Sequence, residues 1–181
     1  MRIVGGKYRN RRLHPPREME ARPTTDFAKE GLFNVLHHSV PLEGIRVLDL
    51  FAGTGNISLE FLSRGAAEVI SVEQDRKLYE FMQRTARELG EKSWRMVKSD
   101  VFPFLRAHRG RYDIIFADPP FHMEGIEKIP DLVRENGLLD PEGSLIIEHH
   151  DKVDLSPLPG HDRTRKYGLV HFSFFRFAEE G

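Results

Sequence analysis

Short apolar runs along the chain alternate with segments in which apolar residues recur every three or four positions. The short runs predict buried strands, and the longer spacing predicts helices with one buried face. The predicted strands are residues 45–50, 68–73, 95–98, 112–117, 145–148 and 170–174. The first helix is predicted to follow the N-cap residues Thr24 and Thr25. Two further helices are predicted at residues 56–63 and 78–89, a short helix begins near Pro103, and a last helix covers residues 126–133. Strands that alternate with helices indicate an α/β fold with a doubly wound, mostly parallel sheet.

The last predicted strand has a different pattern from the others. Val170, Phe172 and Phe174 alternate with other residues, as in a strand that buries one face. We therefore expect an antiparallel C-terminal strand that covers the edge of the sheet.

The first 22 residues have a character of their own. Arg2 to Val4 and Tyr8 to Leu13 flank two adjacent glycines, which favours a small β-hairpin. An isolated hairpin is marginally stable in water, so we expect it to pack on the rest of the chain. We divide the chain into an N-terminal arm, residues 1–22, and a second domain, residues 23–181.

The composition suits a single globular body, with 181 residues of which 39% are hydrophobic and 30% charged. The chain contains no cysteine, which excludes a disulfide framework, a thiolate metal site and a cysteine nucleophile. No signal-peptide pattern follows the first residues, and no apolar run reaches the length of a membrane span. We expect a cytoplasmic protein without a membrane partner.

The formal net charge of −1 hides an uneven distribution. Residues 1–22 carry seven arginines and lysines against two glutamates, whereas acidic residues predominate in the remainder. A basic segment on a mildly acidic body is typical of a contact with phosphates, and aromatic rings among arginines are typical of contacts with exposed RNA. A merely solvated terminus is the alternative. The predicted RNA contacts are Arg2, Lys7, Tyr8, Arg9, Arg11, Arg12 and Arg22.

One predicted strand stops abruptly at Asp118, which is followed by Pro119, Pro120 and Phe121. A carboxylate at the carboxyl end of a parallel strand lies where open α/β sheets bind ligands. The two prolines stiffen the loop and remove two backbone donors, which leaves the Asp118 carboxylate and the Pro119 carbonyl as acceptors beside an aromatic ring. This combination favours a planar group that carries an NH2, such as a nucleobase. An ordinary Asp-Pro turn at the end of a strand is the alternative.

A glycine-rich turn follows the first predicted strand. Gly53 and Gly55 let the backbone approach a ligand, and the helix that begins nearby offers N–H groups to a carboxylate or a phosphate. The turn does not complete a dinucleotide fingerprint, because Ser58 stands where the third glycine is expected. The predicted cofactor contacts in this turn are Asp49, Phe51, Ala52, Gly53, Thr54 and Gly55.

Two further acids end the next predicted strands. Glu73 lies 20 positions after Gly53, where an acid can accept hydrogen bonds from both hydroxyls of a ribose. Asp100 follows the third strand and can accept from the amino group of an adenine while Val101 or Phe102 lines the ring. For Asp100, a helix N-cap is the alternative. The spacing suits an adenosine cofactor.

Both motifs resemble those of a known family. The segment DLFAGTG, residues 49–55, resembles motif I of class I S-adenosylmethionine-dependent methyltransferases, and DPPF, residues 118–121, resembles their amino-methylating motif IV. The chain also contains RIVGGKYRNRRL, RPTTD, LFN and SLEFLSRGA, which begin at residues 2, 22, 32 and 58. Together these segments resemble the 16S ribosomal RNA guanine-N2 methyltransferase family over nearly the whole length. The resemblance implies a Rossmann-like fold with a seven-stranded sheet.

The resemblance also implies a reaction. S-adenosylmethionine would lie with its amino-acid end near the glycine-rich turn, its ribose on Glu73 and its adenine near Asp100. Asp118 and the Pro119 carbonyl would hold N2 of a guanine, with Phe121 stacked on the base, and no metal would take part. The expected partner is 16S rRNA or the small ribosomal particle, and we expect a monomer.

Three residues depart from the family pattern, namely Phe27 in place of an arginine, Asn56 in place of a small residue and His122 in place of a basic residue. These departures concern contacts with RNA. A DNA-adenine or protein-glutamine methyltransferase, a nucleotide-binding oxidoreductase and an inactive RNA-binding module are the alternative functions. The pairs His37–His38 and His149–His150 are interpreted as surface residues, because adjacent side chains on a regular element point apart and suit a metal poorly.

Overall fold

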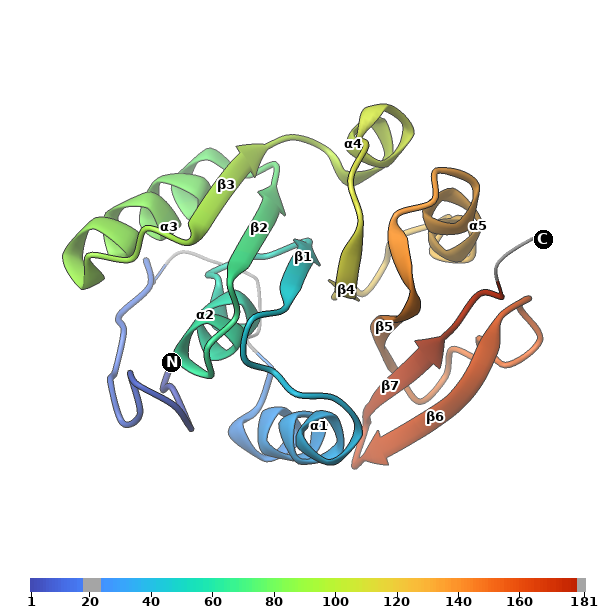
Figure 1. Cartoon of the computed structure of the whole chain (residues 1–181), viewed down its shortest axis with the longest axis horizontal. Helices are drawn as coiled ribbons and strands as arrows, with labels where there is room; N and C mark the ends of the chain where they lie inside the picture. The colour runs from blue at the N-terminus through green and yellow to red at the C-terminus, as the bar shows by residue number, and fades with distance from the viewer. Residues whose placement is uncertain (18–23, 179–181) are drawn as a thin grey trace.

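The computed structural model describes residues 1–17 and 24–178, which form a seven-stranded sheet with helices on both faces (Figure 1). The strands are β1 (Arg46–Leu50), β2 (Glu68–Glu73), β3 (Trp94–Lys98), β4 (Tyr112–Ala117), β5 (Leu139–His150), β6 (His161–Tyr167) and β7 (Val170–Phe175). The helices are α1 (Asp26–Ser39), α2 (Asn56–Ser63), α3 (Arg76–Leu89), α4 (Val101–Ala107) and α5 (Lys128–Glu135). The strand order is β3-β2-β1-β4-β5-β7-β6, in which β7 is antiparallel to both neighbours and the other pairs are parallel.

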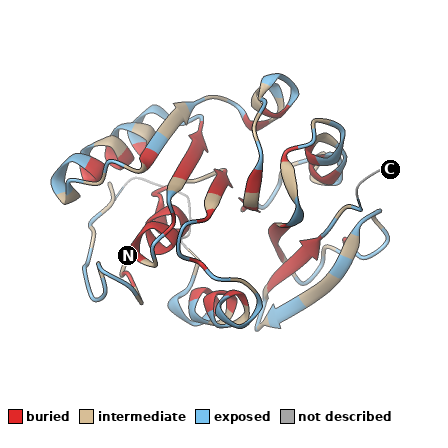
Figure 2. Cartoon of the chain, in the orientation of Figure 1, coloured by how far each residue is buried: buried red, intermediate tan, exposed pale blue. Residues whose placement is uncertain are grey.

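The sheet separates two layers of apolar side chains. Residues of α1, α2 and α3, such as Leu32 and Phe61, pack on one face. Residues of α4 and α5, such as Leu105 and Val133, pack on the other. Figure 2 shows that burial is concentrated in the central strands and in α2, whose eight residues are all buried. The carboxyl ends of the central parallel strands therefore meet at one edge of a well-packed sheet.

The predicted α/β fold and its seven-stranded sheet are confirmed, and α2 and β2 begin and end at the predicted residues. β5 starts earlier than expected, because Pro141 and Gly143 lie within the strand although such residues usually interrupt one. The pairing of β5 with β4 is irregular at this point, and a Cβ on residue 143 would lie only 2.9 Å from the Tyr112 carbonyl oxygen. Close approach of the two backbones thus accounts for the glycine.

One expectation about the end of the sheet is wrong. β7 does not cover the edge, because β6 pairs with its outer side. The sequence of β6, HDRTRKY, has no apolar alternation, and none of its residues is fully buried. An edge strand that buries few side chains has no hydrophobic periodicity, so the sequence did not predict β6. The antiparallel direction of β7 is confirmed.

The N-terminal arm is folded onto the body. The N–H of Ile3 donates to the Arg11 carbonyl at 3.0 Å, and the Ile3 carbonyl accepts from Asn10 at 2.8 Å. Arg2 and Arg12 form an isolated antiparallel bridge rather than part of two full strands, so the hairpin is present in a reduced form. Ile3 is fully buried in the layer of α1 and α2, which fixes the arm to the domain.

Helix α1 lies between the arm and β6. Its N-cap is Thr25, whose Oγ1 accepts from the Ala28 N–H at 3.2 Å. Gly31 permits a close contact, because the Tyr167 hydroxyl donates to its carbonyl at 3.0 Å and a Cβ would lie 2.2 Å from the Tyr167 ring. Thr24 does not cap the helix but reaches the sheet, where it contacts Glu148.

Candidate active site

The turn after β1 combines left-handed backbone with open space. Gly53 and Gly55 have φ angles of 61° and 82°, a region that favours glycine. Phe51 has a φ of 58°, which is uncommon for a bulky residue and marks strain often found at functional turns. A Cβ on Gly53 would meet nothing within 4 Å, so a ligand can approach the backbone there. Ala52 and Thr54 lie in the same turn, and the Thr54 hydroxyl contacts the Met1 sulfur at 3.0 Å.

Asp49 lies beneath this turn rather than on its surface. It is 1% exposed, and the Ser58 hydroxyl donates to its Oδ2 at 2.5 Å. The Trp94 indole N–H donates to the Ser71 hydroxyl at 2.7 Å, and the two serine hydroxyls are 2.6 Å apart. Burial raises the pKa of Asp49 to about 7, although the bond from Ser58 acts in the opposite direction. Ser58, which breaks the dinucleotide fingerprint, therefore holds the first turn of α2 to β1 and β2.

Glu73, at the end of β2, lies next to the glycine-rich turn. Its Oε2 accepts from the Gly53 N–H at 3.1 Å, and its Oε1 lies 3.4 Å from the Asp75 N–H. Burial raises the pKa of Glu73, with the Gly53 bond opposing. An acid at this position, at the edge of an open turn, is placed to accept from hydroxyls of a bound ligand.

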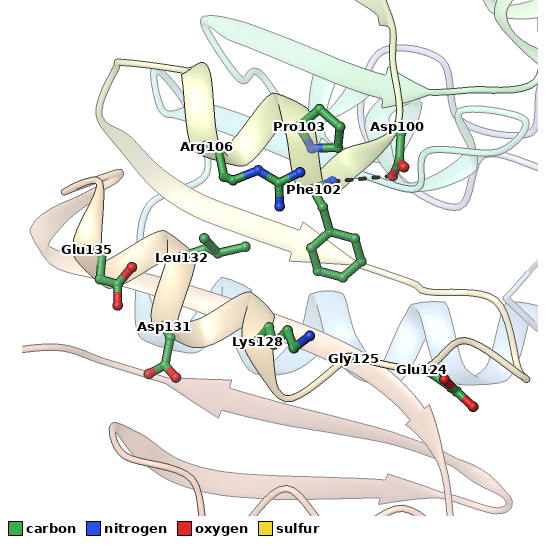
Figure 3. Close-up of a pocket in the computed structure, with 10 residues that line it drawn as sticks. All are labelled: Asp100, Phe102, Pro103, Arg106, Glu124, Gly125, Lys128, Asp131, Leu132 and Glu135. Carbon is green, nitrogen blue, oxygen red and sulfur yellow. Dashed lines mark hydrogen bonds between the residues drawn. The ribbon is translucent and has the colours of Figure 1, made fainter.

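Asp100 is exposed and caps α4, since its Oδ1 accepts from the Phe102 N–H at 3.3 Å. The alternative N-cap role is thus present, and it leaves the second carboxylate oxygen open. Val101 is buried in the core, whereas Phe102 points into a cavity of about 570 Å³ between α4 and α5 (Figure 3). The cavity is also lined by Arg106 and Lys128. Asp100 and Phe102 lie at one side of this cavity.

Asp118, just after β4, lies beside Glu148 of the adjacent strand β5. Ala117 and Ile147 are the last paired residues of β4 and β5, so the next residue on each strand is an acid. The two carboxyl groups are in hydrogen-bond contact, and burial together with the Glu148 charge raises the pKa of Asp118 well above its usual range. Glu148 is 8% exposed, and the Thr24 hydroxyl donates to its Oε1 at 2.8 Å. Sequence reasoning missed Glu148 as a site residue, although it is the last residue of the predicted strand 145–148.

The residues after Asp118 present an aromatic surface. Pro119 is buried, Pro120 is exposed, and the Phe121 side chain is 63% exposed. The Phe121 ring stacks on His150 with ring centroids 4.3 Å apart and lies edge-on to His122 at 4.7 Å. A large exposed ring that is held by its neighbours suits stacking on a planar ligand.

The cations of the arm divide into two groups. Arg2 pairs with Asp26 at 3.3 Å, and Lys7 pairs with Glu91 at 3.0 Å, so both hold the arm to the body. Tyr8 does the same, because its hydroxyl donates to Glu91 at 2.5 Å. The other predicted contacts among the described residues, Arg9, Arg11 and Arg12, are exposed. Arg22 lies outside the described residues.

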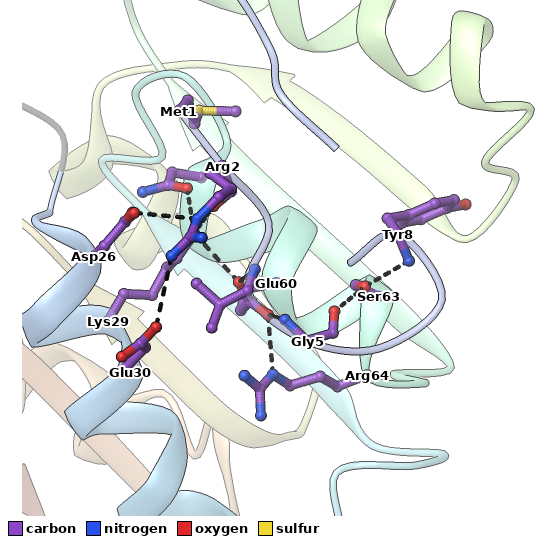
Figure 4. A network of polar contacts seen from close by, with 12 residues as sticks. Met1, Arg2, Gly5, Tyr8, Asp26, Lys29, Glu30, Glu60, Ser63 and Arg64 are labelled. Atoms are coloured by element: carbon purple, nitrogen blue, oxygen red, sulfur yellow. Dashed lines mark hydrogen bonds and ion pairs between the residues drawn. The ribbon is translucent and has the colours of Figure 1, made fainter. Parts of the chain in front are cut away.

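A buried ion pair, also missed from the sequence, docks the arm (Figure 4). Lys29 of α1 and Glu60 of α2 are 3.2 Å apart with both side chains fully buried. Glu60 accepts from the Val4 and Gly5 N–H groups at 2.8 and 3.0 Å, and Arg64 donates to it at 3.0 Å. Burial acts to raise the pKa of Glu60, but these bonds and the Lys29 charge outweigh it and leave the pKa lowered. Burial lowers the pKa of Lys29.

A second cavity lies between the arm and the starts of α1 and α2. It measures about 780 Å³, and its lining includes Arg2 and Arg12 of the arm together with Thr24 and Asn56. Thr24, one of the residues that line this cavity, also bonds to Glu148, the acid beside Asp118. Asn56, one of the three departures from the family pattern, accepts from the Lys29 ammonium at 2.8 Å.

The histidine pairs differ from each other. His37 and His38 are exposed as expected, whereas His149 is 8% exposed and bonds to the Ser173 hydroxyl at 2.7 Å. The interpretation of His149 as a surface residue is wrong, because β7 covers it. Within residues 1–17 and 24–178, no group of three or more acidic or histidine side chains is placed to hold a metal ion. No helix in those ranges is long and apolar enough to cross a membrane.

Comparisons with known proteins agree with this geometry. The family model described as conserved hypothetical protein 95 matches residues 1–176. Ribosomal RNA small subunit methyltransferase D of Escherichia coli is 32% identical over the whole chain and 92% of its own length, and YlbH of Bacillus subtilis is 31% identical over 97% and 98%. The solved structure of E. coli yhhF covers 99% of both chains with a TM-score of 0.88 and 32% identity. The chain therefore belongs to the conserved hypothetical protein 95 family, together with ribosomal RNA small subunit methyltransferase D.

Proposed function

We propose that the protein transfers a methyl group from S-adenosylmethionine to N2 of a guanine in 16S ribosomal RNA. The main support for this proposal is that the glycine-rich turn after β1 and Asp118 after β4 lie next to each other in the sheet. Leu50 pairs with Ala117 in the sheet, and the Asp118 N–H lies 3.4 Å from the Leu50 carbonyl oxygen. A cofactor on the turn after β1 would therefore place its reactive end beside the carboxylate that ends β4.

The residues at the strand ends fit S-adenosylmethionine. The open backbone at Gly53 and the Asp49 carboxylate beneath it suit the amino-acid end, whose ammonium group favours ionised Asp49. Glu73 would accept from the ribose hydroxyls, and Asp100 from the adenine amino group beside Phe102. The cofactor supplies an electrophilic methyl group on a sulfonium, so this reaction requires no metal ion.

The target base would lie between Phe121 and Asp118. Guanine N2 is a weak nucleophile because its lone pair is delocalised into the ring. Hydrogen bonds from N2 to the Asp118 carboxylate and the Pro119 carbonyl would turn that lone pair toward the methyl group. The S–CH3 bond breaks as the N2–CH3 bond forms, and the excess proton on N2 passes to Asp118. Holding the reactants in line can contribute up to roughly 7 to 11 kcal/mol.

The exposed arginines of the arm would bind the phosphates of the RNA. Arg9, Arg11 and Arg12 are free to reach outward while Arg2 and Lys7 hold the arm in place. The proposed substrate is 16S rRNA, bare or in the small ribosomal particle, which places the enzyme in the cytoplasm, and we propose that it acts as a monomer. A base within paired RNA would have to flip out, which costs a few kcal/mol.

The role of Asp118 is tested with Asp118→Asn. Binding of S-adenosylhomocysteine, measured by calorimetry, should match that of the unaltered protein, because the proposed anchors of the cofactor, Asp49, Glu73 and Asp100, are unchanged and the product lacks the methyl group that faces Asp118. Methyl transfer to 16S rRNA should fall by about 10²-fold or more, since the acceptor for the N2 proton is lost. Asp162→Asn, at an exposed carboxylate on β6, serves as the matched control and should retain full activity. Unchanged turnover in Asp118→Asn would refute the proposed role.

A further inference from the structure

Glu148 is a buried acid that the transfer step described above does not use. Ala117 of β4 pairs with Ile147 of β5, so the residues that follow them, Asp118 and Glu148, are neighbours. The carboxyl group of Glu148 is in hydrogen-bond contact with that of Asp118. Burial and the neighbouring Glu148 charge raise the pKa of Asp118, so ionised Asp118 beside Glu148 is costly unless a hydrogen-bond donor lies between the two acids. A ligand that presents two hydrogen-bond donors side by side would satisfy both acids at once.

The position of Glu148 agrees with direct contact to a base. Thr24, which donates to Glu148 at 2.8 Å, lines the cavity that extends from Arg2 and Arg12. Phe121 stacks on His150, two residues beyond Glu148 on the same strand. A base stacked on Phe121 with its amino group at Asp118 would therefore direct the adjoining part of its edge toward Glu148.

The Watson–Crick edges of the bases differ at the atom beside the amino group. Guanine presents N1–H next to its N2 amino group, which are two adjacent donors. Adenine presents an N6 amino group next to N1, which is an acceptor, and cytosine presents an amino group next to N3, also an acceptor. A flipped base is read through these edges, and a carboxylate opposite an acceptor is repelled.

We propose that Glu148 accepts the N1–H of the target guanine and thereby selects guanine over adenine. The inference rests on the proposed guanine-N2 transfer and adds to it a specificity-determining residue. Asp118 then accepts from the N2 amino group, and Glu148 accepts from the adjacent N1–H on the same Watson–Crick edge of the guanine. The competing structural role is that Glu148 only anchors Thr24 and the start of α1.

Glu148→Gln separates these two roles. Glutamine keeps the size and an acceptor oxygen for the Thr24 hydroxyl, but its NH2 group opposes the N1–H of guanine and complements an N1 acceptor. Thr24→Val is the matched variant, because it removes the bond to Glu148 and keeps the carboxylate. The substrates are fragments of 16S rRNA with guanine or 2-aminopurine at the base that the unaltered enzyme methylates. The second base retains the N2 amino group and has no hydrogen on N1.

The unaltered enzyme and Thr24→Val should both prefer guanine over 2-aminopurine by roughly 10- to 100-fold in kcat/KM. In Glu148→Gln the preference should vanish or reverse, while S-adenosylhomocysteine binding stays unchanged. If Glu148→Gln retains the preference and only loses activity to the extent of Thr24→Val, the selective role is wrong and the transfer mechanism stands. If the base methylated by the unaltered enzyme is not guanine, the proposed function and this inference both fail.

Discussion

At the scale of single residues, the site consists of acids whose ionisation is opposed by burial. Asp49 and Asp118 both have raised pKa values, for which desolvation is the leading cause. A cation near Asp49 and a base with N–H donors near Asp118 would each relieve that cost. The site is therefore electrostatically suited to the two ligands of the proposed reaction.

The raised pKa of Asp49 makes a prediction about stability. The folded state holds the Asp49 proton more tightly than the unfolded chain does. Protonated Asp49 therefore adds to the free energy of unfolding below pH 4, and this stabilisation is lost as pH rises toward 7. Comparison with Asp49→Asn isolates the effect. Between pH 5 and pH 7 the unfolding free energy of the unaltered protein should fall by roughly 2 to 3 kcal/mol relative to the variant, measured by urea unfolding without cofactor. A pH-independent difference would contradict the raised pKa.

The raised pKa of Asp118 makes a prediction about the pH dependence of turnover. Protonated Asp118 cannot take up the N2 proton, so kcat/KM should rise with pH until Asp118 ionises. The causes of the shift are burial, then Glu148, then Asp49. In Glu148→Gln the acidic limb should therefore move to lower pH, whereas in Asp162→Asn it should not move. An unmoved limb in Glu148→Gln would show that the two acids are not coupled.

Which site residues can be predicted from sequence depends on whether their signal is local. Asp118 and Gly53 stand out because a strand stops abruptly at one and a glycine-rich turn surrounds the other. Glu148 also ends a predicted strand, 145–148, but its partner Asp118 is 30 positions earlier, and their contact arises only from the neighbouring positions of β4 and β5. Glu60 resembles a solvated helix residue until the arm covers α2.

At the scale of elements, the arm and α2 depend on each other. α2 is buried on all sides because the arm covers its outer face, and the backbone of the arm is satisfied by Glu60 and Ser63 of α2. The periodicity of α2 predicts a helix but cannot reveal this covering segment. β6 buries few side chains, so its sequence has no strand periodicity, and its place in the sheet follows only from its pairing with β7.

Removing the Glu60 charge tests this docking. Glu60→Gln leaves Lys29 charged and buried without a full partner, and the unfolding free energy should fall by roughly 3 to 5 kcal/mol. Glu88→Gln, at an exposed position on α3, should change it by less than about 0.5 kcal/mol. Equal unfolding midpoints in urea for the two variants would contradict the account of the buried pair.

At the scale of the whole molecule, the strand order gathers the turn after β1, Asp118 and Glu148 at one edge of the sheet. The arm and the start of α1 border the same edge through the cavity lined by Arg12 and Thr24. The overall charge is close to neutral, so RNA binding depends on where the exposed arginines lie rather than on net charge.

Deleting the whole arm would remove buried Ile3, so the binding test uses Arg11→Ala/Arg12→Ala instead. The slope of log affinity for 16S rRNA against log salt should become shallower by about 1.4, because each phosphate of single-stranded RNA that an arginine neutralises contributes about 0.7 to the slope. Arg109→Ala/Arg111→Ala removes two exposed arginines at the opposite edge of the sheet and should leave the slope unchanged. Equal slopes for the two double variants would assign the arm a purely structural role.

The most direct test of the central claim is to locate the transferred methyl group. The protein is incubated with labelled S-adenosylmethionine and either bare 16S rRNA or small ribosomal particles, and the labelled base is mapped by nuclease digestion and mass spectrometry. Label on N2 of a guanine in the unaltered protein, and its loss in Asp118→Asn, is the predicted result. Label on adenine N6 or on a protein glutamine, or no label with either substrate, would contradict the proposed function.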